Sequence, residues 1–327
     1  MYKSKISILF AIPFLLFGIA CAETPNFRSE SLGRLAIETV IANDYPSELS
    51  DLQVAKKKMF AYQQDTQTMF PESDQYTCVA DEEGNYLYTD NISDSITCLV
   101  NVDISSAIPD LDAELDFMGI NNVEQYVIQF VEDHFGISAI TYKTCALKRS
   151  TYEFLYEEAR DILDADLAAG GKQGATDLIQ WSSEDVCYIV FLFQSFDGIP
   201  FFARGETAVA NMEVMPYCVN RTGIMAIVFE DGIRYLKIEN AWDVSSSMEA
   251  RKILTLDEAV SMYAQYINDI VALDELVVSD IRLVYGVKDG HASPLWSFEK
   301  EEITDSFHYT CHDFVDAYSG DIIGDGM

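Results

Sequence analysis

Three Asp-Gly pairs constrain the fold of this 327-residue chain more than any other feature of its sequence. They are Asp197-Gly198, Asp231-Gly232 and Asp289-Gly290, and each lies between two runs rich in β-branched and aromatic residues. Asp-Gly favours the two-residue turn of a β-hairpin, because the central turn positions need positive φ angles. The sequence therefore predicts antiparallel strands that follow one another as meanders.

The closing stretch, "CHDFVDAYSGDIIGDGM", gathers a cysteine, a histidine and several aspartates, the residue types of a metal or catalytic cluster. However, Gly320 suits the left-handed position of a hairpin turn, and Asp316 suits the role of acceptor for the turn backbone. On a strand, His308 and His312 would lie about 13 Å apart, because each residue advances ~3.3 Å. We therefore predict a hairpin with a structural aspartate here, with no metal site and no catalytic residue.

Helices are expected beside these strands. Apolar spacings of three and four predict helices in "LGRLAIETVIA" and "DLQVAKKKMFAYQQ", and alternation predicts strands in "QYTCVA", "NYLYTD" and "SITCLVNVDI". Further helices are predicted from Asn122 to Gly136, from Ser150 onward, and after the capping box of Thr255 and Glu258. The expected fold class is α+β, with twisted antiparallel sheets packed by helices.

The chain begins with the layout of an export signal. Two lysines precede an apolar run from Ile6 to Ala20, which is shorter than the ~20 residues that span a bilayer as a helix. Ala20 before Cys21 suits lipoprotein processing, and the same small residues also fit ordinary signal peptidase. We favour a lipid-anchored Cys21, and hence a membrane-anchored, extracytoplasmic lipoprotein; secretion without an anchor is the alternative.

Seven cysteines fit an exported chain. If Cys21 is lipidated or removed, 7 − 1 leaves six, which permits up to three disulfides. The most local pair is Cys78 with Cys98, and closing that loop would contribute roughly 3 kcal/mol. The alternative is that some of these cysteines are buried free thiols. No CxxC spacing occurs, which argues against a zinc ribbon or a thioredoxin-type pair.

The formal net charge of −33 limits the partners of this chain. A surface this negative repels nucleic acid and anionic lipid headgroups, so neither is expected to bind. It would attract cationic partners or divalent ions, and in the simpler interpretation it only keeps an exported protein soluble.

Searches for catalytic and cofactor motifs are negative. GxSxG, HExxH, P-loop and GxGxxG patterns do not occur, so we predict no cofactor. Carboxylate pairs such as Glu157 and Asp161 carry little information among 54 acidic residues. Aromatic residues give a better indication of binding: Phe196, Trp242 and Trp296 lie on predicted strands or turns and form a candidate binding surface. Core packing is the alternative role for these three side chains.

The segments "ILTLDEAVSMYAQYI", "IRLVYGV", "SPLWSF" and "FVDAYSGDII" resemble PepSY-type modules over about 75 residues from Ile253. They are also similar to the C-terminal part of the extracytoplasmic YycH/YycI-type regulators of a sensor kinase. "SFDGIPFF" resembles the hairpin of a second module, and "CLVNVDISSAIPD" with "FMGINNVEQYV" resembles uncharacterised Gram-positive lipoproteins that end in such a domain. The resemblance implies four parts: a signal peptide with lipobox (1–21), an N-terminal helix-plus-strand region (22–117), and PepSY-like modules at 118–252 and 253–327.

These observations favour an exported, non-catalytic binding or regulatory protein of the cell envelope, whose partner is an unidentified envelope protein or a small ligand. One alternative is a cell-envelope hydrolase that uses paired carboxylates. Another is peptidase inhibition or chaperoning, which the resemblance to PepSY modules implies.

Overall fold

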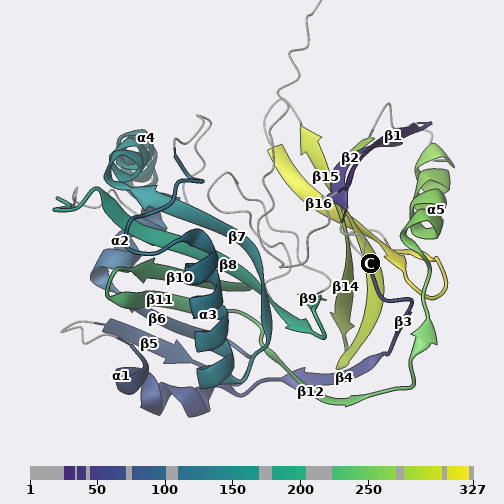
Figure 1. The fold of residues 1–327 in the computed structure, drawn as a ribbon, viewed down its shortest axis with the longest axis horizontal. Helices are drawn as coiled ribbons and strands as arrows, with labels where there is room; N and C mark the ends of the chain where they lie inside the picture. The colour runs from purple at the N-terminus through teal and green to yellow at the C-terminus, as the bar shows by residue number, and fades with distance from the viewer. Residues whose placement is uncertain are drawn as a thin grey trace, which may run out of the picture.

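The computed structural model describes residues 26–33, 35–41, 45–70, 76–100, 110–168, 179–203, 223–269, 276–303 and 308–323. Within these ranges the fold is mixed α and β, with a 15-stranded, mostly antiparallel sheet and five α-helices. The sheet divides into two lobes, which lie side by side in Figure 1. The predicted mixed architecture of antiparallel strands packed by helices is confirmed.

The first lobe is a six-stranded antiparallel sheet with the strand order β5-β6-β11-β10-β8-β7. Its strands are β5 (Tyr76–Ala80), β6 (Tyr86–Asp90), β7 (Ala139–Lys148), β8 (Asp185–Phe196), β10 (Gly223–Phe229) and β11 (Gly232–Ile238).

Helical segments cover both faces of this first sheet (Figure 1). On one face lie the 3-10 helix η1 (Met59–Asp65), α1 (Thr66–Met69) and α3 (Ile120–Phe135). On the other lie α2 (Asn91–Val100) and α4 (Arg149–Ala168). Alternate residues of β6, β7, β8, β10 and β11 therefore enter two separate apolar cores.

The second lobe is built around the hairpin of β14 (Leu276–Lys288) and β15 (His291–Ile303). The strands that extend it are β1 (Asn26–Leu32), β2 (Leu35–Ile41), β4 (Leu52–Lys56), β12 (Trp242–Ser247), β16 (His308–Asp316) and β17 (Ile322–Ile323). Helix α5 (Leu256–Asp269) packs on one face over Trp296, Phe298 and Tyr285. The short strands β3 (Glu48–Leu49) and β13 (Arg251–Lys252) form a separate pair.

Strand β9 (Ile199–Ala203) joins the two lobes, because it pairs antiparallel with β8 and parallel with β14. A second connection comes from Gln194, whose side chain forms two hydrogen bonds with the backbone of Trp242. The Trp242 N–H donates to Oε1 of Gln194 at 2.9 Å, and Nε2 of Gln194 donates to the Trp242 carbonyl at 2.6 Å.

The two lobes repeat one arrangement. In the first, α3 precedes the meander β7-β8-β10-β11, and in the second, α5 precedes the meander β14-β15-β16-β17. Helix α4 is inserted between the first two strands of the first meander. The N-terminal strands are divided between the lobes, since β5 and β6 extend the first sheet and β1, β2 and β4 extend the second.

The predicted hairpins, the capping box of Thr255 and Glu258, and the helix end at Gly136 are confirmed, whereas the helix predicted from Asn122 begins at Ile120. Each of the three Asp-Gly pairs at 197, 231 and 289 joins two paired strands, and Asp197, Gly198, Asp289 and Gly290 all have positive φ angles. Helix α3 ends at the left-handed Gly136. At the start of α5, the Thr255 N–H donates to Oε2 of Glu258 at 2.8 Å and the Glu258 N–H donates to Oγ1 of Thr255 at 3.3 Å, which is a capping box.

Three predicted elements are wrong, one of them only in part. Leu35–Ile41 and Leu52–Lys56 form strands instead of helices, and the helical part of the second predicted helix begins only at η1. Leu35, Ile37 and Thr39 are buried at every second position, as in a strand, and β-branched residues favour strands. The segment "SITCLVNVDI" begins inside helix α2 instead of forming a strand. Asp90 caps that helix, since its Oδ1 accepts the Ser93 N–H at 2.8 Å, and Ile96 and Leu99 are buried at helical spacing.

Candidate functional site

A group of polar and charged side chains lies on the face of the second sheet opposite α5. Alternate residues of β14, β15 and β16, such as Ile281, Trp296 and Val315, pack in the core beneath α5. The residues between them share the opposite face. Two rows cross the strands in the order β14, β15, β16, and together we call them the junction cluster: Asp280, Glu299 and His312 in one row, and Arg282, Ser297 and Phe314 in the next.

Ser297 and Glu299 lie on two sides of the imidazole of His312. Oγ of Ser297 lies 3.0 Å from Nδ1 of His312, and Oε2 of Glu299 lies 3.6 Å from Nε2. Burial, and after it the charge of Arg282, lowers the pKa of His312 to about 4, against the opposite effect of Asp280 and Asp313. His312 is therefore neutral at pH 7.

Arg282 connects the junction cluster to the first lobe. Its guanidinium lies 5.0 Å from the ring centroid of Tyr142 on β7 and 5.7 Å from that of Phe193 on β8. These are cation–π contacts, and Asp280 balances the charge through an ion pair. Burial lowers the pKa of Arg282, but the neighbouring charge of Asp280 raises it overall, so the arginine stays charged. Arg282 thus forms a direct contact between the two lobes.

The contacts of His312 invite comparison with a Ser-His-carboxylate triad, and the chemistry differs in three ways. In a triad, Nε2 of the imidazole faces the serine and Nδ1 faces the acid, which is the reverse of the arrangement around His312. Ser297 is only 1% exposed, so a substrate carbonyl does not reach its Oγ in this conformation. A histidine with a pKa of about 4 is also a weak general base. The arrangement suits a structural junction better than a nucleophile.

The closing stretch forms the predicted hairpin. Oδ1 of Asp316 accepts the backbone N–H groups of Tyr318 at 2.9 Å and Ser319 at 2.8 Å, and Gly320 takes the left-handed conformation with φ +79°. His308 and His312 both lie on β16, as predicted; the side chain of His308 is outside the described residues. Among the residues that the structure describes, no three His, Cys, Asp or Glu side chains are grouped to hold a metal ion.

The three aromatic residues of the predicted binding surface have different surroundings. Trp296 is 1% exposed beneath α5, and its Nε1 donates to the Leu254 carbonyl at 3.0 Å, so its assignment to a surface is wrong. It is buried because even-numbered residues of β15 face α5. Phe196 and Trp242 are half-buried near the junction between the lobes, with Nζ of Lys56 lying 4.1 Å from the Trp242 ring centroid.

The predicted Cys78–Cys98 disulfide is not formed, because Cys78 is a free thiol. Its Sγ lies 3.2 Å from Oγ1 of Thr66 on the α3 side of the first sheet, whereas α2, which carries Cys98, packs on the other side. The sheet therefore separates the two positions. Cys145 and Cys187 are buried free thiols, and burial raises the pKa of both, which makes them unreactive at neutral pH. Cys21 lies outside the described residues.

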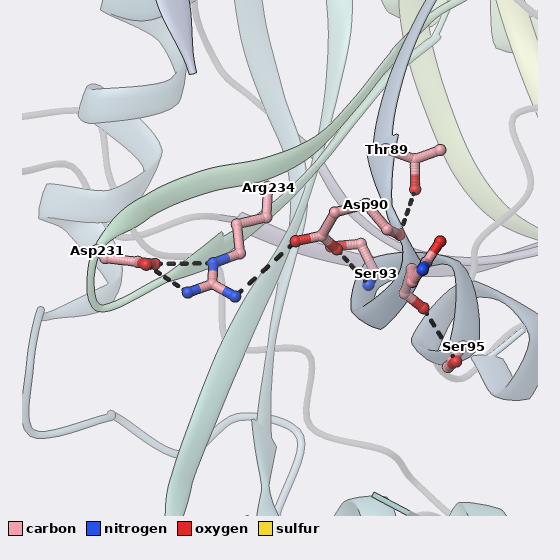
Figure 2. Close-up of polar contacts among 7 residues, drawn as sticks. Thr89, Asp90, Ser93, Ser95, Asp231 and Arg234 are labelled. Atoms are coloured by element: carbon pink, nitrogen blue, oxygen red, sulfur yellow. Dashed lines mark hydrogen bonds and ion pairs between the residues drawn. The ribbon is translucent and has the colours of Figure 1, made fainter. Parts of the chain in front are cut away.

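A second polar group surrounds Arg234 on the first lobe (Figure 2). The pairing of β10 with β11 passes from Tyr235 to Ile233, so Arg234 is the extra residue of a β-bulge. Its Nε donates to Asp231 at 3.0 Å, and its Nη1 lies 3.8 Å from Oδ2 of Asp90, the residue that caps α2. Two carboxylates thus balance this arginine, and the contact ties the start of α2 to the sheet.

Comparisons with known proteins give a likeness in fold. No family model matches the chain, and no curated protein matches it either. A crystal structure of an uncharacterised protein from Eubacterium rectale ATCC 33656 is similar, with a TM-score of 0.56 and 15% identity, over 89% of this chain and 90% of that one. Among the described helices, none is long and apolar enough to cross a membrane.

Sequence reasoning missed most of the junction cluster. It singled out His312 but not Arg282, Ser297 or Glu299, which are adjacent only across strands. Their signal is alternation: polar residues at 280 and 282 on β14, and at 297 and 299 on β15, interrupt the apolar pattern every second position. Once the hairpin turn at Asp289-Gly290 is placed, the register follows and brings Arg282 opposite Ser297.

Proposed function

We propose that this protein is an exported, lipid-anchored, non-catalytic binding or regulatory protein of the cell envelope. The observation that carries this proposal is that the most reactive side chains of the junction cluster are buried and serve contacts between strands. Ser297 and His312 are 1% and 7% exposed, and their polar atoms join strands. A site that fixes two lobes relative to each other suits a scaffold that presents a surface.

The best candidate for that surface is the outer end of the first lobe. Val79 on β5 is 57% exposed, Phe60 on η1 is 59% exposed, and Tyr76 on β5 is 38% exposed. The Phe60 N–H donates to the carbonyl of Asp81 at 3.2 Å, which ties η1 to the end of β5. Exposed apolar side chains at the last strand of a sheet favour contact with another protein. Because the chain carries a net charge of −33, the partner is expected to be basic.

The repeated helix and four-stranded meander supports two PepSY-like modules as part of this proposal. Their proposed bounds, 118–252 and 253–327, each include a helix followed by a meander, and the first also includes the inserted helix α4. A regulatory role similar to that of YycH/YycI-type proteins rests on the sequence resemblance.

The test compares surface variants during crosslinking in native membranes. We expect the double variant F60S/V79S to lose a crosslinked envelope protein that wild type captures, whereas M248S keeps it. Met248 is a suitable control because it is 50% exposed but lies on the second lobe, after β12. Equal capture by all three proteins, or no specific capture by wild type, would count against this surface.

The second candidate function is a hydrolase, which the Ser297–His312–Glu299 contacts favour. It predicts turnover of ester, peptide or glycoside substrates that S297A and E299Q both abolish. We expect no turnover above that of these variants. Activity in wild type that disappears in S297A, with the fold intact by circular dichroism, would replace the non-catalytic proposal.

A further inference from the structure

His312 lies where the two lobes meet. The ring of Phe202, on the joining strand β9, packs edge to face against it with the centroids 5.0 Å apart. Ser297 and Glu299 on β15 contact the two imidazole nitrogens, and Arg282, which reaches across to the first lobe, occupies the next row of the same face. A change in the charge of His312 would therefore act on β9 and on Arg282 together.

Charged groups of both signs lie near this imidazole, with Lys300 and Asp313 on the α5 face of the sheet. Arg282 and Lys300 oppose its protonation, whereas Asp280 and Asp313 favour it, and Glu299 lies nearest to Nε2 at 3.6 Å. Asp313 is already engaged, since it accepts hydrogen bonds from Tyr263 at 2.6 Å and from Lys300 at 2.9 Å. A proton on His312 would place a second buried cation beside Arg282, with most of the carboxylates committed elsewhere.

We propose that the junction between the lobes is acid-sensitive: protonation of His312 weakens the contacts of Arg282 and β9, and the lobes loosen before either of them unfolds. The buried ring binds a proton more weakly than an exposed one, by roughly 300-fold for a pKa of about 4 against 6.5. The stabilising effect of neutral His312 is therefore complete above pH 6.5 and is lost as the pH falls toward 4. This inference concerns regulation and holds whether or not the proposed partner exists.

Hydrogen exchange of the purified protein tests the inference at pH 6.5 and at pH 4.5, with rates corrected for intrinsic exchange. We expect peptides that cover β9 and the centre of β14 to lose protection at pH 4.5, while peptides from α3 keep it. In H312N, whose amide can still bond to Ser297, the pH-dependent loss should disappear. H291N is the matched control, because His291 is exposed, and it should behave like wild type.

Equal loss in wild type and H312N would overturn the proposal, and so would simultaneous loss in α3, which indicates global unfolding. If H312N does not fold, an NMR titration of the His312 ring in wild type tests whether protonation of His312 loosens the junction. Protonation well below pH 6, together with the loss of protection in β9, supports the proposal. Protonation near pH 6.5 with an intact junction contradicts it.

Discussion

At the scale of single residues, two glycines show two different costs of adding a Cβ: backbone strain alone, and strain together with close contact to neighbouring atoms. Gly84 and Gly198 have similar φ angles, +87° and +77°. A Cβ at Gly198 would meet nothing within 4 Å, whereas one at Gly84 would lie 2.5 Å from the carbonyl oxygen of Ala241 and 2.6 Å from its nitrogen. Those atoms are backbone and cannot move aside as a side chain does. The Ala241 N–H also donates to the Gly84 carbonyl at 2.8 Å.

We therefore expect G198A to lower the free energy of unfolding by about 1 kcal/mol, the usual cost of a left-handed residue with a Cβ. G84A should lower it by about 3 kcal/mol or more, because overpacking against fixed backbone adds to that strain. Chemical denaturation of both variants measures the difference. Equal destabilisation would mean that the loop around Gly84 shifts at little cost.

At the scale of secondary structure, sequence patterns predicted elements well where local chemistry decides the conformation. The Asp-Gly turns, Gly136 and the Thr255–Glu258 box each fix a conformation through their own backbone or a neighbouring side chain. The prediction for residues 35–41 is wrong because a short apolar run fits both the helical period of 3.6 and the strand period of 2. Pairing with β14, more than 230 residues away, decides that these residues form a strand.

The junction cluster could be predicted only in part, for a related reason. The sequence pattern places His312 on a strand, as the structure does. Arg282, Ser297 and Tyr142 come together through strand register and through the packing of two lobes, neither of which leaves a short motif in the sequence. Pairs such as Arg282 with Tyr142 depend on tertiary packing, which periodicity does not encode.

The start of α5 provides a prediction for one element. T255A removes the hydroxyl that accepts the Glu258 N–H at 3.3 Å and donates to its carboxylate at 3.0 Å. We expect a loss of about 1 kcal/mol in unfolding free energy, the typical cost of losing an N-cap. S261A is the control, because Oγ of Ser261 bonds only the Asp257 carbonyl within the exposed part of the helix, and it should change stability by less than about 0.5 kcal/mol. If thermal unfolding shows that T255A and S261A lose equal stability, the capping role of Thr255 is contradicted.

At the scale of the whole molecule, the two lobes share a sheet but have separate apolar cores. The core beneath α5 and the cores of the first lobe are distinct clusters of buried residues. The contacts that couple them include the pairing of β9, the contacts of Arg282 with the Tyr142 and Phe193 rings, and the Gln194–Trp242 hydrogen bonds. Cooperative unfolding of the chain should therefore depend on these contacts more than on its large cores.

Gln194 allows that dependence to be measured, because its side chain is 6% exposed and its two polar atoms both bond the Trp242 backbone. Q194A removes both hydrogen bonds and leaves the backbone N–H and carbonyl of Trp242 without these partners. We therefore expect the free energy of unfolding to fall by about 2 to 4 kcal/mol. If the lobes are coupled mainly at this junction, the denaturation curve should also change from one transition into two, seen as a lower apparent m-value. Q129A is the control, since Gln129 bonds only the exposed Asp133 on α3, and it should leave the curve unchanged. A single, equally steep transition in Q194A would show that β9 and Arg282 are sufficient to keep the lobes together.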